Sequence, residues 1–144
     1  MMSELIISMV PVNLVGILWD KCVPHLEALI PMSYGQYTVE SVKERALRGA
    51  TTLILVIDGE DVVAVNTIQV DVKESGLRVL ELPLTSGSRL DEWEGPFITL
   101  MKALAKEQNC TEIIGYAARK GWIRRLEQYG FTEAQTIIRC ELGE

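Results

Sequence analysis

The hydrophobic positions of the chain follow two periods, one typical of strands and one typical of helices. Runs rich in β-branched residues, or with every second residue apolar, predict strands. These runs are Leu5–Val10, Thr51–Ile57, Val62–Val72, Leu77–Leu84, Thr111–Ala117 and Phe131–Leu142. Runs with apolar residues three or four positions apart predict helices. These are Val12–Ile30, the segment between Thr38 and Gly49, Pro96–Gln108 and Arg119–Tyr129.

Turn and capping residues separate these runs. Asp58–Asp61, with a glycine in its centre, predicts a hairpin turn, and Lys73–Gly76 predicts a second turn. Pro24 predicts a kink or a division into two short helices, because proline removes a backbone donor inside a helix. Pro96 is expected in the first turn of its helix, after a polar loop over Thr85–Glu94. Thr38 is a plausible N-cap, while Gly49 and Gly130 are expected to end helices.

The order of these elements is β-α-α-β-β-β-α-β-α-β. Strands and helices in such an order predict a mixed α/β fold, with a central mixed sheet and helices on both faces. No internal repeat, low-complexity tract or linker divides the sequence. Residues 1–144 are therefore expected to form a single domain, a usual size for one hydrophobic core.

Composition narrows the classes of partner. The formal net charge is −6, so a nucleic-acid partner is not expected. The three cysteines are widely spaced and only one histidine is present, so we expect reduced thiols and no metal site. No apolar run approaches the ~20 residues that span a membrane, and the N-terminal residues lack the basic start of a signal peptide. The sequence thus favours a cytoplasmic protein without a membrane partner.

The most specific pattern lies near the C-terminus. In ARKGWIRRLEQYGF, residues 118–131, a helix ends on the pair Gly130-Phe131 that begins the next strand. Together with the element order, this resembles the GNAT superfamily of N-acetyltransferases. The Arg-Lys-Gly-Trp opening resembles compact GNAT-like proteins of tailed bacteriophages. Some of those are regarded as enzymes and others as virion-associated or host-takeover proteins. The resemblance implies a location in the infected bacterial cell or the virion, and a host or virion protein as a partner.

The resemblance also implies a site for acetyl-CoA. The family binds the pyrophosphate with a loop of pattern Gln/Arg-x-x-Gly-x-Gly/Ala before a helix, and the segment 92–97 is expected to correspond to it. Gly95 matches the first glycine. Glu92 replaces Gln or Arg, and Phe97 replaces Gly or Ala. The other positions implied to hold the cofactor are Leu82, Leu84 and Arg89.

This expected loop looks poorly suited to phosphate. Asp91, Glu92 and Glu94 would repel a dianionic group, and Pro96 lacks one backbone donor. Arg89 offers one compensating charge. In the alternative interpretation, the three carboxylates simply complement the positive end of a helix.

The resemblance points to catalytic positions as well. Many family members place a proton-donating tyrosine five residues before the phenylalanine of the Gly-Phe pair, and this position holds Leu126. Tyr129 and Tyr116 are the alternative candidates, each of which could equally be a core aromatic residue. Glu81 stands where several members carry a base for the substrate amine.

Glu81 also has a simpler interpretation. Strand alternation predicts Leu80, Leu82 and Leu84 on one face, and Val79, Glu81 and Pro83 on the other. Glu81 would then be a solvent-facing or edge carboxylate. A protein-contact surface is a separate expectation, because the predicted loops carry large side chains that are enriched at interfaces. These are Met32, Tyr34, Tyr37 and Trp93.

Two functions follow from the sequence. In the first, the chain is a GNAT-fold protein with a degenerate acetyl-CoA site that acts by binding a protein partner. In the second, it is an active acetyl-CoA-dependent N-acetyltransferase that acts on an amine of a small molecule or a protein. Fold-level resemblance alone does not choose between them.

Overall fold

The computed structural model describes residues 4–33, 35–86, 88–116 and 120–143. Its strands are β1 (Leu5–Met9), β2 (Thr52–Asp58), β3 (Asp61–Val72), β4 (Arg78–Thr85) and β5 (Glu112–Gly115). Its helices are α1 (Val15–Leu29), α2 (Val39–Leu47), α3 (Leu90–Glu107) and α4 (Lys120–Glu127), with short 3₁₀ turns η1 (Val12–Leu14) and η2 (Ile30–Ser33).

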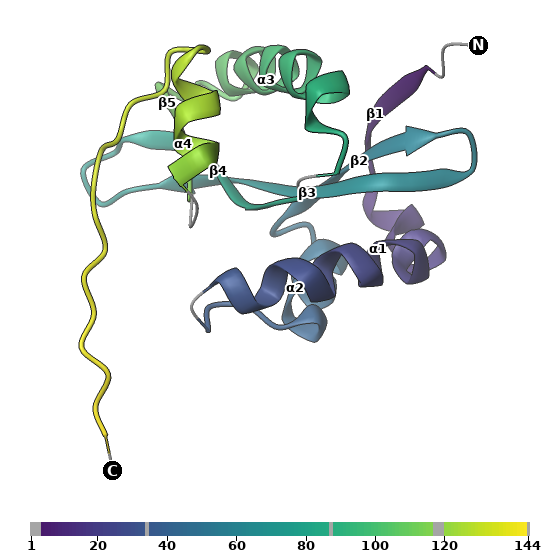
Figure 1. Ribbon diagram of the computed structural model, residues 1–144, viewed down its shortest axis with the longest axis horizontal. Helices are drawn as coiled ribbons and strands as arrows, with labels where there is room; N and C mark the ends of the chain where they lie inside the picture. Colours follow the sequence, from purple (N-terminus) through teal and green to yellow (C-terminus); the bar gives the residue numbers. More distant parts are fainter. Residues whose placement is uncertain (1–3, 34, 87, 117–119, 144) are drawn as a thin grey trace.

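The strands form one mixed sheet in the order β1-β2-β3-β4-β5. The first three pairings are antiparallel, and β5 lies parallel to β4. Helices α1 and α2 cover one face of the sheet, and α3 and α4 lie on the other (Figure 1). The predicted mixed sheet with helices on both faces is confirmed.

Each face of the sheet has its own hydrophobic core. Side chains such as Leu53 and Leu55 pack against α1 and α2, while their neighbours Ile54 and Val56 pack under α3. Residues of β2 alternate between the two cores, because successive side chains of a strand point to opposite faces. Since β2 is covered on both sides, it reads in the sequence as a continuous apolar run.

Several local predictions are confirmed. Thr38 caps α2, since its hydroxyl accepts from the Ser41 amide at 2.9 Å and the Ser41 side chain accepts from the Thr38 amide. The hairpin between β2 and β3 turns at Gly59, where φ is +62°. After α4, Gly130 has φ +92°, and the amides of Gly130 and Phe131 donate back to the carbonyls of Glu127 and Leu126, as in a Schellman ending.

The two prolines do not act as predicted. Pro24 lies within the single helix α1, and Pro96 lies well inside α3 instead of in its first turn. The helix begins earlier because Trp93 is buried, and its indole N–H donates to the Ser88 carbonyl at 2.6 Å. Tertiary packing thus outweighs the hydrogen bond lost at Pro96. Burial also removes Trp93 from the predicted contact surface, whereas Tyr34 lies outside the described residues.

The predicted last strand, Phe131–Leu142, is wrong. Phe131 packs against the core under α3, but residues 131–143 pair with no strand of the described chain. The segment runs outward past the sheet, as the yellow trace in Figure 1 shows. A strand needs a neighbour for its backbone donors and acceptors, and an alternating pattern does not supply one. We call residues 132–143 the C-terminal tail.

In the described part of the chain, no helix combines the length and the hydrophobicity that a membrane crossing requires.

Candidate functional site

The fourth strand contains a β-bulge. Glu81 faces Gln69 of β3, but the next recorded pair is Leu84 with Thr67, so three steps along β4 match two along β3. Pro83 lies within this irregularity, at a position where proline's missing N–H is tolerated. The Leu84 amide donates to the Thr67 hydroxyl at 3.1 Å instead of to a backbone carbonyl.

The bulge changes which way β4 side chains point. Leu80 and Leu82 belong to the core under α3, whereas Leu84 belongs to the core under α1 and α2. The prediction that these three leucines share one face is therefore wrong, because an extra residue in a strand inverts the alternation after it. The proline within the strand was the signal in the sequence that could have revealed the bulge.

The same place marks the end of pairing between β4 and β5. The parallel ladder runs from Val79 with Glu112 to Leu82 with Gly115, and stops there. Strand β4 continues to Thr85, so its last residues have no β5 partner. Backbone groups at such an interruption can pair with an extended ligand that carries amides of its own.

Glu81 and Tyr116 meet beside this interruption. The Tyr116 hydroxyl donates to Oε2 of Glu81 at 2.5 Å, and only 7% of Glu81 is exposed. The structure thus brings together two of the three predicted catalytic candidates. Glu81 is not the solvent-facing carboxylate of the simpler interpretation. Tyr116 directly follows β5, and its residue is about half-exposed, at 47%.

Charge and burial around this pair affect the phenol. Desolvation, followed by the hydrogen bond to the Glu81 carboxylate, raises the pKa of Tyr116 above its usual value. Tyr116 therefore stays a protonated phenol at neutral pH. Nearby, Lys73 and Asp71 form an ion pair at 2.5 Å, and the hydrogen bond from Lys73 lowers the pKa of Asp71. Among the described residues, Glu81 itself forms no ion pair.

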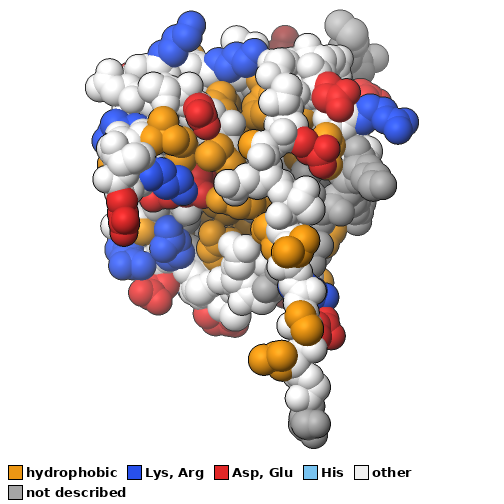
Figure 2. All heavy atoms as spheres, turned by 90° about the vertical axis from the view of Figure 1, so that its left-hand side faces the viewer, with side chains coloured by type: hydrophobic (Ala, Val, Ile, Leu, Met, Phe, Trp, Pro, Cys, Tyr) orange, Lys and Arg blue, Asp and Glu red, His pale blue; other side chains and the backbone are white. Residues whose placement is uncertain are grey.

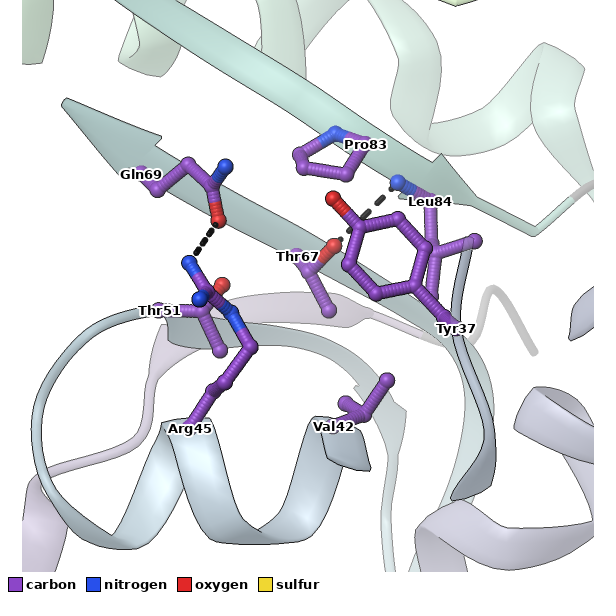
Figure 3. A pocket seen from close by; sticks show the side chains of 8 residues that line it. All are labelled: Tyr37, Val42, Arg45, Thr51, Thr67, Gln69, Pro83 and Leu84. Carbon is purple, nitrogen blue, oxygen red and sulfur yellow. Dashed lines mark hydrogen bonds between the residues drawn. The ribbon is translucent and has the colours of Figure 1, made fainter. Parts of the chain in front are cut away.

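A small pocket lies between α2 and the bulged part of the sheet (Figure 3). Arg45 reaches across it to the Gln69 side chain, at 2.9 Å, and the Tyr37 ring lies beside Pro83. Its volume, about 10 Å³, is enough for one water molecule.

Tyr129, the third candidate, lies elsewhere. Its hydroxyl donates to Oε1 of Glu94 at 3.1 Å, at the contact between α4 and α3. A Cβ on Gly95 would lie 3.7 Å from the same hydroxyl, so the glycine borders this helix contact. Burial, followed by the hydrogen bond to Glu94, raises the pKa of Tyr129.

The segment 92–97 does not form the predicted phosphate loop, because it lies inside α3. Phe97 is fully buried and meets Trp93 edge-to-face, with ring centroids 5.4 Å apart. A core ring at this position therefore says nothing about access for phosphate. The free amides of the helix start belong instead to its first turn, which begins at Leu90.

Two arginines neutralise the carboxylates near the start of α3. Arg89, whose φ is +55°, contacts Asp58 at 2.8 Å and Glu92 at 2.6 Å. Arg125 of α4 contacts Asp91 and Glu94, each at 2.7 Å. Asp91 and Glu92 also lie in the first turn, where negative charge is favourable.

Leu126 lies in the core under α3. No proton donor therefore occupies the position where the family resemblance implies a tyrosine. Tyr116 is the phenol that the structure places beside Glu81.

Comparisons with known proteins find the fold but no close relative. No protein-family model matches the sequence, and no curated protein does. A ribosomal-protein-alanine N-acetyltransferase from Brucella melitensis superimposes with a TM-score of 0.69 at 13% identity, over 97% of this chain and 100% of that one. A predicted acetyltransferase from Clostridium acetobutylicum, solved with acetyl-CoA, gives 0.65 at 12%, over 96% of each chain.

Glucosamine-6-phosphate N-acetyltransferase from Arabidopsis thaliana gives a TM-score of 0.66 at 10% identity, over 97% of this chain and 99% of that one. The chain therefore has the fold of the GNAT acetyltransferases. At these identities, the likeness concerns the fold alone.

Proposed function

We propose that the chain is an N-acyltransferase that passes an acyl group from acetyl-CoA to an amine, with Glu81 as the base. The Glu81–Tyr116 pair beside the interrupted β4–β5 ladder carries this proposal. A fold neighbour that was solved with acetyl-CoA supports the class of cofactor. The correction at α3 also supports it, because Phe97 is a core residue and no longer an argument against binding.

The residues at the interruption fit the amide-bearing arm of the cofactor. Backbone groups from Leu82 to Thr85, beyond the last β5 pair, would hold the arm, and the first-turn amides of α3 would face the phosphates. When bound, the cofactor supplies an acyl group activated as a thioester. Arg89 would approach the phosphates only by sharing the charge that it now gives to Asp58 and Glu92.

Glu81 can accept the proton that the amine must lose. A buried carboxylate favours a positively charged neighbour, so it would also attract the protonated form of the amine. The Tyr116 hydroxyl would orient the carboxylate and, because it stays protonated, could return a proton to a departing thiolate. Leu126 cannot do this.

The substitution Glu81→Gln tests the role of the base. It keeps the side-chain shape, and we expect at least a 100-fold loss of acyl transfer, since general-base catalysis contributes about 10²–10⁴. The affinity for acetyl-CoA, measured by calorimetry, should stay within about twofold, because a base for the amine does not hold the cofactor. Acylated products from a panel of polyamines, aminoglycosides and peptides should be detected by mass spectrometry, because Cys110 and Cys140 would react with thiol dyes.

Glu112→Gln is the matched control, since this exposed carboxylate lies on the neighbouring strand. Its transfer rate should equal that of the unmodified chain. Equal rates for Glu81→Gln and the unmodified chain would reject Glu81 as the base. No calorimetric binding at millimolar acetyl-CoA would reject the whole proposal.

A second function is favoured by Leu126 and by the charge near α3. There, four carboxylates face two guanidinium groups, which leaves no surplus positive charge for phosphates. The chain would then keep the GNAT fold with a degenerate site and bind a host or virion protein, as the resemblance to phage proteins implies. Absence of acetyl-CoA binding, with capture of one defined protein from a bacterial lysate, is the result expected of this function.

A further inference from the structure

The C-terminal tail, residues 132–143, leaves the body of the protein in an extended form (Figure 1). Its large apolar side chains are open to water: Ile138 is 90% exposed and Leu142 92% exposed. Figure 2 shows hydrophobic side chains along this projecting segment. Exposed apolar side chains gathered on one segment point to a binding surface.

The tail has the composition of a strand. Neither proline nor glycine occurs from Thr132 to Leu142. Alternate positions share one face, and that face is the less polar one: Ala134, Thr136, Ile138, Cys140 and Leu142. The tail therefore has the pattern of a half-buried strand, but the described chain gives it no partner.

An open strand edge is present on the same chain. β5 is the last strand of the sheet and, among the described residues, pairs only with β4. The outer backbone groups of Glu112–Gly115 therefore face no strand. An unpaired edge is a template for pairing with another segment.

The beginning of the tail is anchored away from this edge. Lys102 of α3 donates to the Tyr129 carbonyl at 2.8 Å, and the Phe131 amide donates to the Leu126 carbonyl at 3.3 Å. Both contacts hold residues 129–131 in the layer of α3 and α4. From there the tail passes outside the sheet instead of along β5 (Figure 1).

We propose that two copies of this chain form a dimer in which the tail of each copy adds as a strand to the outer edge of β5 of the other. A twofold exchange satisfies both edges and both tails, and closes without leaving a further edge. With about six tail residues on each edge, and roughly 60 Å² buried per residue on the tail and as much on the receiving surface, the two exchanges bury on the order of 1,400 Å². That area lies within the range of stable interfaces.

Light scattering and sedimentation of the full chain from about 5 to 200 μM test the dimer. A dimer is expected, and a monomer over the whole range would overturn the proposal. Deletion of residues 132–144 should give a folded monomer, because the tail lies outside both cores. Ile138→Lys should weaken dimerisation at least tenfold. Glu133→Lys, which adds a lysine on the opposite face, is its control. Circular dichroism should show that every variant is folded.

Isotope mixing distinguishes exchange from pairing within one copy. Equal amounts of ¹⁴N and ¹⁵N protein are mixed and treated with a bismaleimide, which reaches Cys140 of the tail and Cys110 ahead of β5, but not the buried Cys22. Linked Cys110–Cys140 peptides that combine the two isotopes support exchange, and Cys110→Ser should abolish them. Links confined to one isotope would show that the tail pairs with its own β5, and would overturn the proposal.

Discussion

Two glutamates, Glu94 and Glu81, are equally buried, at 7% exposure, and each accepts a hydrogen bond from a tyrosine. Their remaining neighbours differ. Glu94 also contacts Arg125 at 2.7 Å and Gln128 at 3.4 Å, so its charge is matched within the contact between α3 and α4. Glu81 has no ion pair among the described residues, and it lies where the β4–β5 ladder ends.

This difference separates a structural carboxylate from one that is available for chemistry. A buried charge that is already neutralised by a guanidinium stabilises its own surroundings and has little to offer a ligand. A buried carboxylate held by a neutral phenol keeps its negative charge for a cation or a proton. The comparison predicts that changes near α3 alter stability, whereas changes at Glu81 alter reactivity.

The largest expected effect on stability comes from Phe97→Ala in α3. The ring is fully buried against Trp93, so its removal should lower the free energy of unfolding by about 4 kcal/mol. Urea denaturation measures the loss. A loss below about 1 kcal/mol would show that Phe97 is not part of the core, and would restore its place in a ligand site.

A smaller effect is expected when the two glutamates are compared directly. Glu94→Gln should cost about 2 kcal/mol, because Arg125 loses its buried partner, although about a third of its side chain is exposed. Glu81→Gln should cost less than about 1 kcal/mol, since a neutral amide still accepts from Tyr116. Urea denaturation of both variants checks this order, and equal losses would remove the distinction between the two sites.

The smallest effect concerns pH. The folded-state pKa of Tyr116 is raised, so the folded chain holds this proton more tightly than the unfolded chain. The resulting stability is present below the unfolded pKa of about 10, and is lost as the pH rises above it. In Tyr116→Phe, the free energy of unfolding should fall less steeply above about pH 10. Identical slopes for both proteins would contradict the environment described for Tyr116.

The local signals that the sequence contains proved sufficient where neighbours in the chain decide the structure. Thr38 caps its helix through Ser41, three residues away. Gly59 and Gly130 adopt the positive φ angles that their turns require. The order of elements, which follows from hydrophobic periods, led to the mixed sheet and to the GNAT fold.

The errors share a physical origin, since each involves contacts between distant segments. Pro96 suggested a helix start, but burial of Trp93 begins the helix earlier. The tail has the pattern of a strand, but the edge that it would need lies in another layer of the molecule. Half of the candidate site was likewise beyond the sequence. Glu81 and Tyr116 were each predicted, but their hydrogen bond joins residues 35 positions apart.

The sequence by itself therefore determined the elements, the fold class and the residue types available for catalysis, because periodicity, caps and turns act over a few residues. Tertiary structure alone decided which carboxylate is neutralised and which is not. That outcome depends on where α4 places Arg125 and on where the bulge of β4 ends its pairing with β5.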